Sequence, residues 1–304
     1  MKNNILSNGI ISLNKPVGIT STKAISKIKR ILTPRKIGHG GTLDPLASGV
    51  LLIFINRATK FSKYALECSK EYLCTVRFGQ STNTFDDEGE VMEEKPIPYL
   101  NSIDIQLILS KYVGDLQQIP PIHSAVKIKG KPSYYYARKN IDVNLKPRKV
   151  SIYDISLIEW DGKDLKLKIS TSKGFYVRSF ADEIGRQFNT VSFLKNLKRI
   201  RVGMFQCNES ICLDALMSMS LDQIETQDII KSPDQLLTDH EPILINDNLV
   251  PYFTEKQPFE IENLENHTRF KVYDKDKCFL GTAHFDNSNK TLIRNELYKM
   301  NNIL

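Results

Sequence analysis

The chain has 304 residues, of which 41% are hydrophobic and 25% charged. These are ordinary values for a folded globular protein, so collagen-like, low-complexity and wholly disordered chains are excluded. The longest apolar run, residues 50–55, is far shorter than the roughly 18 residues that a membrane-spanning helix needs. The N-terminal residues lack the apolar core of a signal peptide. We therefore expect a cytoplasmic protein with no membrane attachment.

Positive and negative charge alternate along the chain in four blocks. The net charge is +7, and the blocks carry +10 (residues 1–70), −6 (71–126), +10 (127–212) and −7 (213–304). Folded together, the two basic blocks would form a positive surface suited to a polyanion. Charge alone predicts two solvated lysine-rich faces equally well.

The cysteines and histidines do not predict a metal site. The five cysteines are odd in number and include no C-x-x-C pair, which argues against a disulfide framework and against a zinc knuckle. The five histidines are scattered along the chain. We expect buried reduced thiols, isolated structural imidazoles and no bound metal.

The first half of the chain predicts helices and strands around a glycine-rich loop. A helix begins at Thr20 or Ser21, either of which can cap it, and runs to Leu32 before Pro34 stops it. The next predicted elements are, in chain order, a glycine-rich loop over residues 38–45, an apolar strand over 50–55, a half-buried strand over 72–78, an acidic turn over 86–90 and a helix over 105–113 that Gly114 closes.

The second half continues the mixture of strands and helices. Alternating leucine or isoleucine and lysine over residues 165–169 predict a strand with one wet face, and an apolar stripe over 180–188 predicts a helix. Phe193, Leu194 and Leu197 predict a second, short helix. No regular βαβ rhythm connects these elements, which favours an α+β fold with a mixed sheet.

The last part of the chain has a different pattern of residues. Residues 268–273, 278–285 and 290–297 read as short strands joined by turns rich in Asp and Asn. This pattern predicts a small all-β unit, with the join around residues 240–242. We expect two domains, residues 1–243 and residues 244–304.

The block GHGGTLDPLASGVL, residues 38–51, is the strongest candidate for chemistry. Its glycines have neither the Lys-Ser/Thr ending of a phosphate-binding loop nor the G-x-G-x-x-G spacing of a dinucleotide-binding turn. What remains is one carboxylate, Asp44, between flexible glycines and the rigid Pro45. This feature alone favours a turn-capping Asp44. Residues 86–90 likewise predict a solvated turn, because they lack the ligand spacing of a calcium loop.

The same block resembles the catalytic motif, GHTGTLDPLATGVL, of the TruB family of tRNA pseudouridine synthases. Further segments resemble that family's motifs in the family's order: NKPVGITS (residues 14–21), KEY (70–72), TNTFDDEG (82–89), QIPPIHSAVK (118–127) with YAR (136–138), and SKGFYVRS (172–179). The resemblance covers residues 10–205, and the tail resembles the family's C-terminal PUA-like barrel. Gly40 and Asn83 depart from the motifs, which have threonine and aspartate there, and Gly40 adds backbone freedom beside His39.

The resemblance implies an enzyme that converts uridine 55 in the T loop of tRNA to pseudouridine. It implies a mixed-sheet pseudouridine synthase domain followed by a PUA-like domain. The reaction transfers no electrons and imports no group, so no cofactor is expected. The T-arm of tRNA is the expected partner, no protein partner is required, and we expect a monomer.

The resemblance also implies roles for individual residues. Asp44 would be the nucleophile, and Arg178, at the end of a strand, would keep it ionised because an adjacent guanidinium lowers the pKa of an Asp. Tyr72 would stack on the uracil and pass on the proton released from carbon 5. From the residues alone, Arg178 is equally well a surface ion pair and Tyr72 an ordinary core residue.

Four further residues complete the predicted site. Tyr176 and Leu197 would form walls of the uracil pocket, His39 would fill the space that a flipped base leaves, and Lys15 would support the catalytic loop. The alternative function is a non-catalytic protein that binds or folds tRNA on the same scaffold. The presence of Asp44 together with its predicted partners favours the enzyme.

Overall fold

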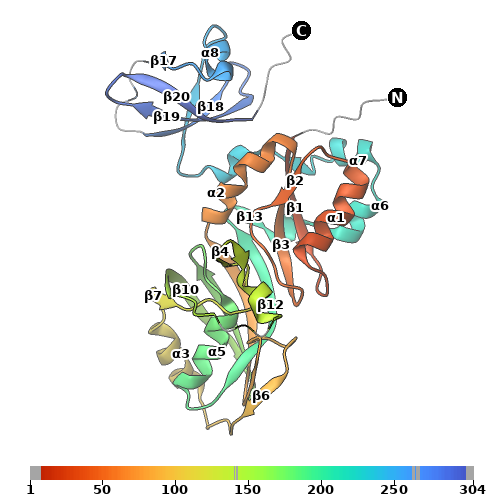
Figure 1. The fold of residues 1–304 in the computed structure, drawn as a ribbon, viewed down its shortest axis with the longest axis vertical. Helices are drawn as coiled ribbons and strands as arrows, with labels where there is room; N and C mark the ends of the chain where they lie inside the picture. The colour runs from red at the N-terminus through yellow and green to blue at the C-terminus, as the bar shows by residue number, and fades with distance from the viewer. Residues whose placement is uncertain (1–7, 140, 142, 262–263, 265–267, 299–304) are drawn as a thin grey trace.

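The computed structural model describes residues 8–298 except residues 140, 142, 262–263 and 265–267. A large mixed sheet with helices packed against it forms the greater part of the chain, and a smaller sheet follows at its C-terminal end (Figure 1). The predicted α+β fold is confirmed, and the second sheet is consistent with a PUA-like domain. No helix among the described residues is long and apolar enough to cross a bilayer.

The large sheet has eleven strands within the described residues, in the order β14-β1-β3-β12-β4-β11-β10-β7, with β2, β13 and β15 paired beside that path. It is mixed because β1 and β14, and β3 and β12, pair in parallel while the other neighbours are antiparallel. Its strands are β1 (Gly9–Lys15), β2 (Ile37–His39), β3 (Ala47–Ile55), β4 (Lys70–Phe78), β7 (Gly114–Gln118), β10 (Arg148–Trp160), β11 (Asp164–Thr171), β12 (Ser192–Val202), β13 (Phe205–Gln206), β14 (Ile211–Cys212) and β15 (Ile230–Lys231). Two small hairpins pair β5 (Gln80–Thr82) with β6 (Val91–Glu94) and β8 (Lys127–Ile128) with β9 (Lys131–Pro132).

The first helix, α1, has the predicted cap and bounds. The Thr20 hydroxyl accepts a hydrogen bond from the Lys23 amide, and the helix ends before Thr33, one residue ahead of Pro34. The helix predicted over residues 105–113 starts earlier and ends at Ser110, and Gly114 opens strand β7 at a φ of +114°. The helices are α1 (Ser21–Leu32), α2 (Ser62–Glu67), α3 (Ser102–Ser110), α4 (Ser133–Ala137), α5 (Val177–Gln187), α6 (Leu213–Ser218), α7 (Leu221–Thr226) and α8 (Val250–Glu255), with 3-10 turns η1 (Asn56–Phe61), η2 (Cys207–Glu209) and η3 (Pro233–Leu236).

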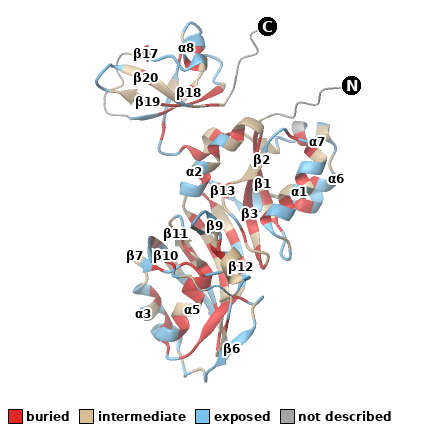
Figure 2. Cartoon of the chain, in the orientation of Figure 1, coloured by how far each residue is buried: buried red, intermediate tan, exposed pale blue. Residues whose placement is uncertain are grey.

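Strand β3 is buried on both faces (Figure 2). Leu51 and Ile53 belong to the core that includes Ile28 of α1, whereas Leu52 and Phe54 belong to a second core on the opposite face. A strand covered on both sides needs no polar alternation, which explains its continuous apolar run. The strand that leads out of the candidate loop is therefore held firmly in the interior.

The short helix predicted around Phe193 is wrong, because these residues form the middle strand β12. β12 pairs with β3 on one side and with β4 on the other. Its pairing with β4 shifts register between Leu194 and Asn196. Such a bulge breaks the two-residue alternation, so Leu194 and Leu197 are both buried although an odd number of positions separates them. The spacing resembles a helical stripe for this reason.

The C-terminal sheet has the strand order β16-β18-β19-β20-β17. The three strands predicted after residue 267 are present, and a further strand, β16, pairs in parallel with β18. β16 spans Glu241–Leu244 and therefore crosses the predicted division between residues 243 and 244, which stays a prediction. The strands are β16 (Glu241–Leu244), β17 (Phe259–Glu260), β18 (Arg269–Tyr273), β19 (Phe279–Asp286) and β20 (Thr291–Leu297).

The two sheets are joined by an aromatic contact. The ring of Phe61 meets the ring of Phe279 at 5.7 Å and that of Tyr298 at 5.8 Å, both edge-on. The Tyr298 hydroxyl donates to the carbonyl of Asn8 at 2.7 Å, and Lys63 pairs with Glu296 at 2.7 Å. The C-terminal sheet is thus packed on the η1–α2 segment that precedes β4.

Gly40 does not supply the backbone freedom expected of it. Its φ is not positive, and its amide donates to the carbonyl of Leu52 at 3.0 Å. A Cβ placed on Gly40 would lie 2.5 Å from the Cβ of Ala65 and 2.8 Å from Cε2 of Phe54. The glycine is therefore required by close packing, since these two neighbours occupy the space that a side chain would need.

We predict that Gly40→Thr, which introduces the residue of the family motif, destabilises this protein. Overpacking of this kind costs about 1–3 kcal/mol, so chemical denaturation should show a lower midpoint. The matched control is Gly38→Ala, because a Cβ there meets no atom within 4 Å and the backbone φ is not positive. An unchanged midpoint for Gly40→Thr would show that the loop relaxes and that the packing argument is wrong.

Candidate active site

The loop that carries Asp44 is fastened to the start of α1. The Ser21 hydroxyl accepts a hydrogen bond from the Leu43 amide at 2.8 Å and donates one to the Leu43 carbonyl at 2.9 Å. Gly18 donates its amide to the carbonyl of Pro45 at 2.8 Å. The residue after Pro45 leads into β3, so both ends of the loop are fixed to buried elements. Asp44 is consequently held in place just before the start of β3.

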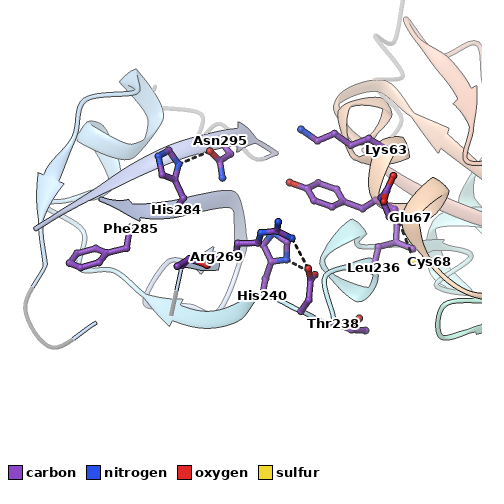
Figure 3. Close-up of a pocket in the computed structure, with 13 residues that line it drawn as sticks. Lys63, Glu67, Cys68, Leu236, Thr238, His240, Arg269, His284, Phe285 and Asn295 are labelled. Carbon is purple, nitrogen blue, oxygen red and sulfur yellow. Dashed lines mark hydrogen bonds and ion pairs between the residues drawn. The ribbon is translucent and has the colours of Figure 1, made fainter. Parts of the chain in front are cut away.

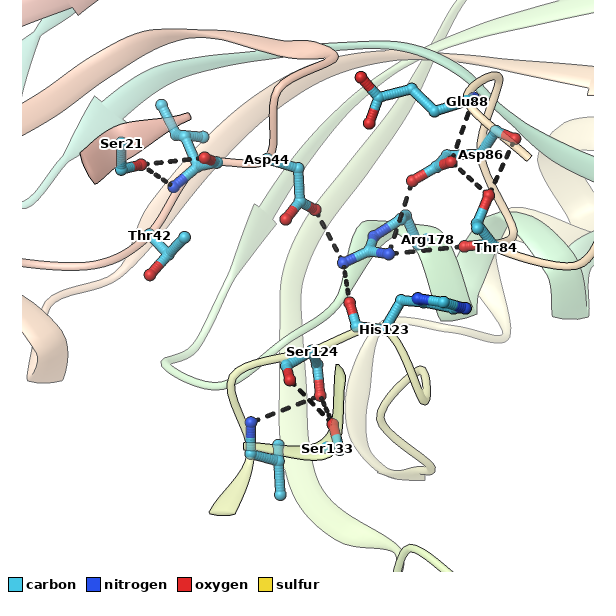
Figure 4. Close-up of polar contacts among 12 residues, drawn as sticks. Ser21, Thr42, Asp44, Thr84, Asp86, Glu88, His123, Ser124, Ser133 and Arg178 are labelled. Carbon is cyan, nitrogen blue, oxygen red and sulfur yellow. Dashed lines mark hydrogen bonds and ion pairs between the residues drawn. The ribbon is translucent and has the colours of Figure 1, made fainter. Parts of the chain in front are cut away.

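Arg178 connects this loop to a second one (Figure 4). It lies in the first turn of α5, not at a strand end as predicted. Its Nη2 is 2.9 Å from Oδ2 of Asp44 and donates to the His123 carbonyl at 2.8 Å. Its Nη1 is 3.5 Å from Oδ2 of Asp86. The guanidinium is 5% exposed, so the predicted surface ion pair is excluded and one buried cation serves two carboxylates.

Asp86 corrects the expectation of a solvated acidic turn. The turn is present, but the Asp86 side chain points inward and the residue is only 3% exposed. It accepts hydrogen bonds from the Thr84 hydroxyl at 2.5 Å and from the Glu88 amide at 3.2 Å. Only the other acidic side chains of the stretch face solvent: Asp87, Glu88 and Glu90.

The pKa of Asp44 differs in direction from the sequence-based expectation. Burial raises the pKa of its carboxyl above the ordinary value, and the negative charge of Asp86 adds to that effect. The ion pair and hydrogen bond with Arg178, and the charge of Lys15, lower the pKa but do not cancel the burial. The ionised carboxylate is therefore held in surroundings that solvate it less well than water does.

A cavity of about 240 Å³ opens beside this ion pair. Asp44, Arg178, Tyr72, Tyr176 and Leu197 all line it, so the structure brings these five predicted site residues together. Burial raises the pKa of the Tyr72 hydroxyl. Its lining combines apolar and aromatic side chains with a few charged groups, as ligand pockets commonly do.

Lys15 and His39 lie outside the lining of this cavity. Lys15 is fully buried, and its Nζ donates to the carbonyls of Pro16 at 2.7 Å and Ile19 at 2.8 Å. Burial lowers the pKa of Lys15 to about 8. His39 ends β2 half-buried, and its Nδ1 finds no partner among the described residues. Burial also lowers the pKa of His39, which favours the neutral imidazole.

Sequence reasoning missed Asp86, Gln118 and Arg199. Asp86 and Gln118 stand within recognised motifs, but no role was assigned to either. The Gln118 side chain accepts from the Tyr176 amide at 2.8 Å and donates to the Tyr176 carbonyl at 3.0 Å, which fixes the backbone of a cavity residue. Arg199 also lines the cavity and is 3% exposed. It stands in a basic run that reads as surface, so no sequence signal separates it from its neighbours.

A larger cavity, about 720 Å³, lies between α2 and the C-terminal sheet (Figure 3). Its lining includes Lys63, Arg269 and His284. None of the predicted site residues lies there. The carboxylate, the guanidinium and the aromatic side chains converge on the smaller cavity, which we take as the candidate active site.

Comparisons with known proteins agree on the family. Residues 29–177 match the family described as "TruB family pseudouridylate synthase (N terminal domain)". Two bacterial relatives, each named tRNA pseudouridine synthase B, are 36% identical to this chain: one from Methylobacillus flagellatus over 92% of this chain and 91% of its own, and one from Francisella tularensis subsp. novicida over 94% and 93%.

Solved structures share the fold at low sequence identity. An H/ACA ribonucleoprotein bound to a substrate RNA containing 2′-deoxyuridine matches with a TM-score of 0.73 at 19% identity, over 97% of this chain and 86% of that one. An archaeal box H/ACA Nop10–Cbf5 complex matches with a TM-score of 0.72, also at 19% identity, over 97% and 87%. The fold is that of these RNA-associated proteins. By its sequence, the chain belongs to the TruB family of pseudouridylate synthases.

We predict that Asp44→Asn raises the thermal midpoint at pH 7. A carboxyl whose pKa is raised by folding lowers stability once pH exceeds its unfolded pKa of about 3.9, so a neutral amide removes that cost. The gain should shrink as pH falls from 7 toward 4.

The control for this prediction is Asp86→Asn, which should lower the midpoint. The hydrogen bonds from Thr84 and Glu88 both go to Oδ1, which an amide keeps, but the amide nitrogen that replaces the buried Oδ2 would face the Arg178 guanidinium donor to donor. Thermal unfolding of both variants gives the comparison. A lower midpoint for Asp44→Asn at pH 7 would contradict the idea that the ionised Asp44 carboxylate lowers the stability of the folded protein.

Proposed function

We propose that this protein is a tRNA pseudouridine synthase that isomerises uridine 55 in the T loop. The observation that carries the proposal is the Asp44–Arg178 ion pair at the mouth of a cavity sized for one base, with Tyr72 in its wall. The relatives named tRNA pseudouridine synthase B support tRNA as the substrate class. The position within tRNA follows from the motif resemblance.

The reaction rearranges one nucleotide without adding or removing atoms. The bond from ribose carbon 1′ to uracil nitrogen 1 breaks, and a bond from carbon 1′ to uracil carbon 5 forms. Carbon 5 gives up its proton, and nitrogen 1 ends the reaction protonated. A carboxylate suits such chemistry because it can attack or stabilise an electron-poor centre, as in retaining glycosidases.

Asp44 and Tyr72 have positions suited to these two tasks. Asp44 is held by Arg178 with one carboxylate face toward the cavity, and it would form the transient bond or stabilise the positive charge on the sugar. Tyr72, on β4, would stack on the detached uracil and pass on the carbon 5 proton, giving up its own hydroxyl proton toward solvent or nitrogen 1 as it accepts that one. Leu197 and Tyr176 would hold the ring while it turns over.

The target base must leave its stack to reach this cavity. Extrusion of a base costs a few kcal/mol, and contacts to the surrounding loop must offset it. His39, neutral and half-buried next to the loop, would fill the vacated space. The RNA backbone would follow the exposed cations of the first basic block, which include Lys23, Lys29, Arg30, Arg35 and Lys36.

We predict tritium release from an unmodified tRNA labelled at carbon 5 of its uridines, and loss of that release when position 55 carries cytidine. Asp44→Asn should lower the single-turnover rate by at least about 1,000-fold, the scale of effect that follows loss of a nucleophile. Its tRNA affinity should stay within about tenfold, or about 1.4 kcal/mol.

The matched control is Asp115→Asn, an exposed aspartate paired with Lys149, which should leave the rate unchanged. Tight tRNA binding without any tritium release by the unmodified protein would favour the non-catalytic tRNA-binding alternative. Release that persists with cytidine at position 55 would refute the assigned position.

A further inference from the structure

Arg199 occupies the strand between the two halves of the candidate site. β12 lies between β3 and β4 in the sheet, and Arg199 is the register partner of Gly49 on β3 and of Tyr72 on β4. β3 leads out of the Asp44 loop, and β4 carries the tyrosine. Arg199 is thus placed to contact both.

A glycine allows this close approach. Gly49 has a φ of +101°, and a Cβ there would lie 2.1 Å from the Arg199 carbonyl oxygen. Any side chain at Gly49 would push β12 away from β3 at this point. The backbone of β3 is therefore shaped around Arg199.

The Arg199 side chain donates its hydrogen bonds to main-chain carbonyls in and beside the Asp44 loop. Nε donates to the Val50 carbonyl at 2.7 Å, Nη1 to the Thr42 carbonyl at 3.3 Å and Nη2 to the Gly41 carbonyl at 3.1 Å. The Tyr72 side chain lies close enough for the positive charge of Arg199 to lower its pKa against the effect of burial. The hydrogen bonds thus hold the two residues just before Leu43 and Asp44 close to the tyrosine across the strand.

Arg199 has no structural counter-ion. Among the described residues no carboxylate forms a salt bridge with it, although it is 97% buried. A buried charge without an ionic partner is costly, and an apolar residue in the same place is often at least as stable. Stability alone therefore does not account for a guanidinium here, which points to a role in the chemistry.

We propose that Arg199 is a positioning residue that fixes the Asp44 loop relative to the Tyr72 hydroxyl. This inference rests on the proposed function. To relay the carbon 5 proton, Tyr72 must give up its own hydroxyl proton, and the charge of Arg199 favours that loss: burial raises the pKa of Tyr72, and the guanidinium opposes that rise. Arg199 would thus fix the position of Asp44 and also lower the pKa of the Tyr72 hydroxyl.

The test compares Arg199→Met and Arg199→Lys with a matched control, Arg201→Met. Arg201 is on the same strand, is partly exposed, and binds Glu71 and the Gly203 carbonyl away from the cavity. Single-turnover rates on the labelled tRNA, tRNA affinity and thermal midpoints are measured for each, in the Tyr72 and the Tyr72→Phe background.

Arg199→Met should slow the single turnover by about 100-fold, as a misplaced reacting group does, with affinity changed less than about threefold. Arg199→Lys keeps the charge but cannot span the three carbonyls, so it should recover only part of the rate. In the Tyr72→Phe background both effects should be much smaller, because the partner hydroxyl is already gone.

Two results would overturn the inference. The first is an unchanged rate for Arg199→Lys and Arg199→Met. The second is a rate loss that is equally large with and without the Tyr72 hydroxyl, which would mean a general structural role. If Arg199→Met fails to fold, Arg199→Lys decides the matter alone. Absence of tritium release from the unmodified protein would instead refute the proposed function itself.

Discussion

The rest of the site depends on one interaction: the guanidinium of Arg178 binds both Asp44 and Asp86. It joins Asp44 and Asp86, which come from two loops about forty residues apart in the chain, to a third segment through the His123 carbonyl. Each contact alone would be an ordinary ion pair or hydrogen bond. Together they fix the first turn of α5 against the loop between β2 and β3 that carries Asp44. Removing Arg178 would leave the two carboxylates near each other without a cation between them.

Three other buried cations are held in a different way. Lys15, Lys70 and Arg199 donate to main-chain carbonyls of neighbouring loops and turns. Burial lowers the pKa of Lys15 and of Lys70 to about 8 in each case. Cations bound to carbonyls fix the backbone and keep their positive charge uncancelled. Two of these cations, Lys70 and Arg199, line the candidate cavity and so place positive charge in its wall.

The sequence predicts the candidate site residues better than it predicts the strands that position them. The motifs predict Asp44, Tyr72 and Arg178 as site residues, and the structure brings them to one cavity because each lies near the start of an element: Asp44 just before β3, Tyr72 early in β4 and Arg178 in the first turn of α5. Strand β12 is missed because a bulge disguises its alternation, a feature that local spacing does not reveal. The role of Arg199 depends on that strand and is missed with it.

Charge and glycine content mislead for a similar reason. Asp86 stands in an acidic stretch that reads as solvated, and the distant Arg178 supplies the cation that accompanies its burial. Gly40 reads as a flexible position, but Phe54 and Ala65 leave no room for anything larger. In both cases the decisive neighbour is far away in sequence, where composition and periodicity carry no information.

In the proposed function, the ionisation of Asp44, set by the balance of Arg178 and Asp86, determines activity. The pH dependence of the single-turnover rate tests this most directly. The acidic limb of the unmodified protein should lie above the ordinary Asp pKa of about 3.9, because burial and Asp86 raise the pKa of Asp44. Asp86→Asn should move the limb to lower pH, since it removes the like charge and leaves Arg178 to Asp44. A limb at or below pH 3.9, or one that Asp86→Asn leaves in place, would contradict the account.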